Sequence, residues 1–65
     1  MATLRTESNI GDPDAFYSEL IELHRGLTEE QSRAVNAKLI LLLANQVGDL
    51  TVLRQAMAVA RESLG

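Results

Sequence analysis

The stretch Leu39-Ile40-Leu41-Leu42-Leu43-Ala44 contains six consecutive apolar residues, inside a segment that otherwise has the character of a helix. Successive residues of an α-helix are turned by about 100°, so these side chains point in every direction around the axis. A helix that is apolar on all sides must be covered on all sides. The rest of the 65-residue chain offers it only two more helices. We therefore expect apolar surface on this helix to stay uncovered within one chain.

The spacing of the apolar residues predicts an all-α protein, a three-helix bundle with helices at about 13–25, 29–47 and 50–63. The connections between these helices are two or three residues long, so consecutive helices must fold back on each other. Residues 1–11 show no such period, and we expect them to form a flexible arm ahead of a single domain, 12–65.

Capping signals mark the ends of the three predicted helices. Asp12-Pro13 is typical of a helix start, with Asp12 as the N-cap and proline at the first helical position. Thr28 to Gln31 has the form of a capping box, in which each side chain bonds to the other residue's backbone N–H. Gly26 and Gly48 stand where a helix end favours the left-handed conformation, and Asp49 follows as the next N-cap.

We expect self-association to cover the apolar surface that one chain leaves exposed. Two-fold homodimers are the commonest assemblies, and a helix can pack on its own symmetry mate. Burying several Leu or Ile side chains at about 1.5–3 kcal/mol each would add much to so small a core. We therefore predict a homodimer through the second helix, with an interface made of Leu39, Ile40, Leu42, Leu43 and Val47.

Composition excludes several classes of function. A net charge of −3 and a pI near 4.9 argue against nucleic-acid binding. The chain has no cysteine, so it has neither disulfides nor thiolate metal sites, and a cytoplasmic location fits. The first twelve residues lack the apolar core of a secretion signal, and no apolar run reaches the about 20 residues of a membrane-spanning helix. We expect no cofactor, no metal and no membrane association.

Three polar residues are candidate functional residues. His24, the only histidine, lies on the apolar stripe of the first helix near Tyr17. It is either a functional residue, as a general base or a ligand together with Glu side chains, or a half-buried side chain near a helix end. Asn45 lies on one line of the second helix with Gln31 and Lys38. This line is either a polar seam that fixes the register of an interface or a polar edge facing water.

A helix-turn-helix DNA reader is a remote alternative for the segment from Leu43 to Met57. Arg54, Gln55 and Arg61 would then face bases or phosphates. The acidic balance of the chain argues against this reading. No phosphate-binding loop, nucleophile elbow or metal-ligand cluster is present, so we do not expect an enzyme that acts on its own.

Three runs of the sequence resemble a family of short bacterial proteins of unknown function: DPDAFY at 12–17, LHRGLTEEQS at 23–32 and LLLANQVGD at 41–49. The likeness extends from Asn9 to Arg61. This resemblance implies an accessory role beside flavin-dependent aromatic hydroxylases and other degradation enzymes, and it assigns no active site.

A second resemblance is to the small helical subunit of extradiol dioxygenases of the protocatechuate 4,5 type. It rests on GLTEEQ at 26–31. The later Gly-Asn-containing turn of that subunit is replaced here by Asn45-Gln46-Val47-Gly48. Such a subunit covers a catalytic partner.

Two functions therefore stand side by side. The first is a small helical interaction module that self-associates without catalysis of its own. The second, which the resemblances imply, is an accessory subunit of a larger enzyme in the breakdown of aromatic compounds. His24 or Tyr17 would then lie at the rim of the partner's active site.

Overall fold

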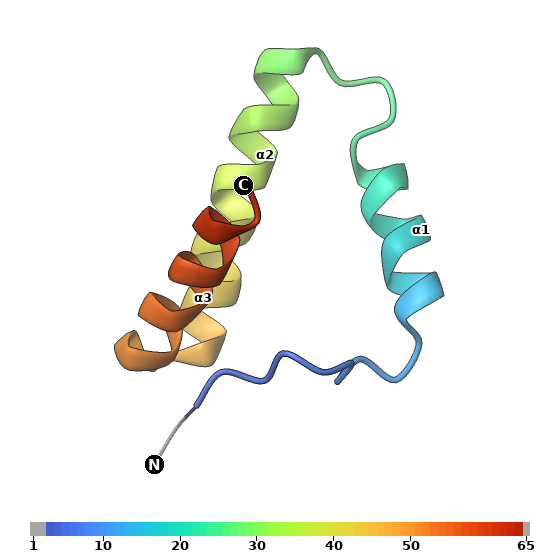
Figure 1. Cartoon of the computed structure of the whole chain (residues 1–65). Helices are drawn as coiled ribbons and strands as arrows, with labels where there is room; N and C mark the ends of the chain where they lie inside the picture. Colours follow the sequence, from blue (N-terminus) through green and yellow to red (C-terminus); the bar gives the residue numbers. More distant parts are fainter. Residues whose placement is uncertain (1–2, 65) are drawn as a thin grey trace.

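Three helices make up the fold of this chain in a computed structural model that describes residues 3–64 (Figure 1). They are α1 (Pro13–Leu23), α2 (Glu29–Val47) and α3 (Leu50–Glu62). The described residues form no strand, which confirms the all-α, three-helix prediction. The bounds of α2 agree with the sequence prediction, and α3 ends one residue earlier than predicted.

The predicted caps account for the helix starts. The side chain of Asp12 accepts a hydrogen bond from the Ala15 backbone N–H at 3.0 Å, and Asp49 accepts one from Val52 at 3.1 Å. Thr28 and Gln31 form the reciprocal capping box, with the two bonds at 3.0 and 3.1 Å. Each cap satisfies backbone donors that have no partner within their helix.

The end of α1 differs from the prediction, because the helix stops at Leu23 rather than near Arg25. The backbone N–H groups of His24 and Arg25 donate to carbonyls only three residues back, at 3.1 Å, which tightens the last turn. Gly26 then takes the left-handed conformation, φ +78°, and the Leu27 N–H returns to the His24 carbonyl at 3.2 Å. This tight turn redirects the chain towards α2.

Helices α2 and α3 form an antiparallel hairpin, in which α3 folds back along the C-terminal half of α2 (Figure 1). Gly48 makes the reversal possible with φ +68°, and its N–H donates to the Ala44 carbonyl at 2.9 Å. The two helices lie alongside each other, whereas a DNA-reading helix-turn-helix crosses at about 90–120°. The hairpin is the packed part of the fold.

Helix α1 stands apart from this hairpin, with no close backbone approach to α2 or α3 (Figure 1). The arm that precedes it runs in an extended course to the base of α3, where the Leu4 N–H donates to the Gln55 side-chain oxygen at 2.8 Å. Leu4 is half-buried there, whereas Ile10 stays exposed. The flexibility predicted for residues 1–11 stays a prediction, and Met1 and Ala2 lie outside the described residues.

The resulting shape is open. The radius of gyration is 13.5 Å, whereas a compact domain of this length would have about 11 Å. No side chain among residues 3–64 is fully buried. The accessible surface is 5879 Å², against about 4100 Å² for a compact monomer of 7.1 kDa. One chain therefore leaves far more surface exposed than a compact fold of its size.

Candidate functional site

A groove of about 560 Å³ runs between α2 and α3, and we call it the docking groove. Its α2 wall has apolar residues at spacings of three and four, and its α3 wall continues the same pattern from the start of that helix. The Gly48-Asp49 turn brings these two stripes side by side. The residues that line it are all apolar: Ile40, Leu41, Leu43, Ala44, Val47, Leu50, Leu53, Ala56, Met57 and Ala60.

Burial separates the floor of the docking groove from its walls. Ala44, Leu53 and Ala56 are half-buried, where α2 and α3 approach each other. The larger side chains above them are open, with Leu41 66% and Met57 61% exposed. The groove is thus a wide apolar surface with a half-buried floor and exposed walls. No side chain in its lining carries a hydroxyl, amide or charged group.

The predicted interface falls partly on this groove. Ile40, Leu43 and Val47 line it, whereas Leu39 is half-buried and Leu42 is exposed outside the lining. The structure therefore brings three of the five predicted residues together on one surface.

Sequence reasoning missed Leu41 and the whole α3 wall of the groove. The predicted interface was confined to the second helix, and it included none of the α3 residues Leu50, Leu53 and Met57 that line the groove. The short Gly48-Asp49 turn was the signal that could have found it, because a turn of that length forces the apolar stripes of α2 and α3 to flank one groove.

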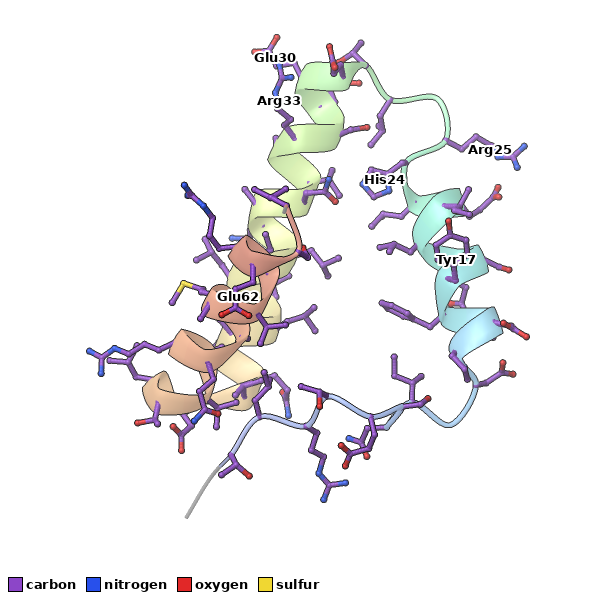
Figure 2. The ribbon with its side chains drawn as sticks, viewed as in Figure 1. Tyr17, His24, Arg25, Glu30, Arg33 and Glu62 are labelled. Atoms are coloured by element: carbon purple, nitrogen blue, oxygen red, sulfur yellow. The ribbon has the colours of Figure 1, made fainter. Side chains whose placement is uncertain are left out.

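His24 is the C-cap of α1 and its side chain points towards α2 (Figure 2). Its Nδ1 lies 2.8 Å from the Leu20 carbonyl, so Nδ1 carries a proton and donates it. Its Nε2 lies 2.8 Å from Oδ1 of Asn36, which joins the two helices through side chains. A charged ring donates to Oδ1, and a neutral ring accepts from the Asn36 amide in its other orientation. Both ring nitrogens are therefore engaged: Nδ1 within the end of α1, and Nε2 in the contact that links α1 to α2.

The other candidate polar residues are scattered. Tyr17 is exposed on α1, and its side chain lies apart from that of His24 (Figure 2). Asn45 is exposed on α2. Gln31 is taken up by the capping box, so it does not continue the line of Lys38 and Asn45. No group of three or more His, Cys, Asp or Glu side chains among residues 3–64 is arranged to hold a metal ion.

The ion pairs of the chain lie on the surface. The side chains of Glu22 and Arg25 at the end of α1 are 3.0 Å apart, and those of Glu29 and Arg33 on α2 are 3.9 Å apart. All four side chains are mostly exposed, so solvent screens both pairs and each contributes at most about 1 kcal/mol. Across the described residues, no helix has both the length and the apolar character that a bilayer crossing needs.

The profile of a family described as "Protein of unknown function (DUF2783)" matches residues 4–62. The chain belongs to this family. The match confirms the predicted resemblance to a family of unknown function and covers α1, the α2–α3 hairpin and most of the arm. Neither a curated protein nor a solved structure gives a significant match to the chain. The likeness to a dioxygenase subunit stays a prediction.

Proposed function

We propose that this DUF2783 protein is a small protein–protein interaction module that self-associates through the docking groove. The observation that carries the proposal is the exposed, wholly apolar lining of that groove, together with the lack of any fully buried side chain among residues 3–64. A small-molecule site of this volume normally adds a few convergent polar groups that orient the ligand. A lining without them fits the apolar face of a helix better.

The exposed surface supports a partner of the size of another chain. The excess over a compact monomer is about 1800 Å², whereas one partner in a standard interface buries about 800 Å². A second copy of the chain is the simplest candidate for this partner, because identical chains pair readily about a two-fold axis. The same association would supply the buried core that one chain lacks.

Sedimentation equilibrium of the purified chain, from nanomolar to high micromolar concentration, tests this function. We expect a dimer that dissociates on dilution. Leu43→Asp places a charge in the docking groove, and Leu42→Asp is its matched control on the neighbouring residue outside the lining. Both leucines are exposed, so either change is compatible with the folded monomer.

We expect Leu43→Asp to raise the dissociation constant by about 100-fold or more, because the dimer would lose an apolar contact from both copies. Leu42→Asp should change it by less than about fivefold. A chain that stays monomeric at high micromolar concentration, or a Leu42→Asp variant as disruptive as Leu43→Asp, would overturn the proposed function.

A further inference from the structure

Basic side chains border the docking groove along its α3 wall. Arg54 and Arg61 lie three residues before and four after Met57, so they share one side of that helix with it. Both arginines are exposed. On α2, Lys38 is offset by about 200° from Ile40 and by about 180° from Val47, and so lies away from the groove. An apolar strip edged by positive charge selects a partner that is apolar and negatively charged at its edges.

Acidic side chains are scarce around the groove. Residues 32–65 contain four basic and two acidic side chains, whereas residues 1–31 contain two basic and seven acidic ones. Of the two acids in the second half, Asp49 is engaged as the N-cap of α3. Glu62 comes nine residues after Leu53, a helical offset of about 180°, and so lies away from the groove. The chain is thus divided into an acidic and a basic half.

Helix α1 has the complementary character. Its apolar side chains Tyr17 and Ile21 are 64% and 53% exposed, so its own chain leaves them uncovered. Asp14 lies three residues before Tyr17 and edges this surface on one side, while Glu19 edges the apolar stripe on the other, four residues before Leu23. This helix is therefore apolar in its middle and acidic at its edges.

The dimensions of helix and groove also agree. Helix α1 has 11 residues and is about 16 Å long, whereas α3, which forms one wall of the groove, has 13 residues and is about 19 Å long. One α1 helix can lie along most of that wall. Of the three helices in the described part of the chain, α1 alone is both short enough and without a close backbone approach to another helix.

The helix in the groove cannot come from the same chain without a large rearrangement. The arm that leads into α1 is bonded to Gln55, which is offset by about 200° around α3 from the groove residue Met57. The arm and the groove therefore lie on opposite sides of α3. The bond between His24 and Asn36 ties the other end of α1 to α2.

We propose that the occupant of the docking groove is helix α1 of a second copy, with each copy placing its α1 in the groove of the other. This inference rests on the proposed function and names the element that the groove recognises. The competing arrangement, groove against groove, would bring Arg54 and Arg61 of both copies to one interface, where like charges repel. Exchange of α1 places acidic edges beside those cations instead.

Charge reversal on each side of the contact tests this arrangement. Asp14→Lys with Glu19→Lys reverses the edges of α1, and Arg54→Glu with Arg61→Glu reverses one border of the groove. We expect each pair of changes to weaken the dimer by about tenfold or more at low salt. The chain with all four changes keeps its net charge of −3, and its dissociation constant should return to within about threefold of the original.

Recovery in the four-fold variant cannot come from better folding of α1, because that helix still carries both lysines. Glu22→Lys is the matched control, since Glu22 lies on the polar side of α1, and it should change the dissociation constant by less than about threefold. If neither pair of changes weakens a dimer that Leu43→Asp still dissociates, α1 is not the occupant while the proposed function stands. A monomeric wild-type chain overturns both.

Cross-linking gives a second readout that does not depend on affinity. The chain has no cysteine, so single cysteines can be placed at will. A Tyr17→Cys chain mixed with a Met57→Cys chain should form a disulfide-linked heterodimer under mild oxidation. A Glu22→Cys chain mixed with Met57→Cys is the control. Equal cross-linking in the two mixtures, or none from Tyr17→Cys, would overturn the exchange of α1.

Discussion

The α2–α3 hairpin and helix α1 differ in how they are held in place. The hairpin is closed by a left-handed glycine, and Ala44, Leu53 and Ala56 are half-buried in it. Helix α1 is linked to the hairpin by two polar contacts, that of His24 at its C-terminal end with Asn36 and that of Leu4 in the preceding arm with Gln55. The same chain therefore contains a packed unit and a tethered one. We expect the tethered unit, helix α1, to be the one that packs against another molecule.

Shortening one leucine in each region should give the largest contrast. Leu53→Ala removes a half-buried side chain from the hairpin floor, and we expect a loss of about 2 kcal/mol in the free energy of unfolding. Leu20→Ala removes a half-buried side chain from the tethered helix and should cost less than about 1 kcal/mol. Urea unfolding followed by circular dichroism, at one low protein concentration, measures both. Equal losses would mean that α1 is packed as firmly as the hairpin.

The two left-handed glycines offer a sharper test with similar strain in both regions. Gly48→Ala and Gly26→Ala each impose a positive φ on a side chain, at a cost of about 1 kcal/mol. An added Cβ meets only an ordinary contact at Gly48, 3.6 Å from the Asn45 carbonyl oxygen, and open space at Gly26. Hydrogen exchange should show faster opening of α2 and α3 in Gly48→Ala, but faster opening of α1 alone in Gly26→Ala. A global loss of protection in Gly26→Ala would contradict the division.

The smallest expected effect concerns the side-chain contact between α1 and α2. Asn36→Ala removes the partner of His24 Nε2, and we expect a loss of about 0.5–1 kcal/mol because the bond is exposed. Small-angle scattering should show a broader range of α1 positions while the helix content stays unchanged. Ala34→Ser, on the same helix, serves as the control for a minor change of α2. An unchanged scattering curve for Asn36→Ala would show that this contact does not position α1.

The local features were largely predictable from sequence. Asp12, Thr28 with Gln31, and Asp49 all act as caps where the pattern placed them, because a cap depends on residues within one helical turn. The end of α1 was misplaced by about two residues. The turn around His24 and Arg25 is tightened because their N–H groups donate to carbonyls three residues back. The spacing of apolar residues does not determine where a helix changes to such bonds.

The site was predictable only in part. The apolar run from Leu39 to Ala44 indicated correctly that surface would stay exposed, and four of its six residues line the docking groove. The sequence pattern could not tell which sides of α2 face α3 and which remain open, because six consecutive apolar residues have no preferred side. Leu39 and Leu42 were therefore assigned to the same surface as Ile40, and the α3 wall was overlooked.

The sequence by itself determined three capped helices, their bounds within two residues, and more apolar surface than one chain can cover. Those properties follow from contacts among near neighbours and from chain length. Only the tertiary structure decided that α3 packs along α2 while α1 stands apart, and so where the groove lies. These packing arrangements depend on the directions of whole helices in space. Tight turns and a few contacts between distant residues, such as Leu4 with Gln55, set those directions.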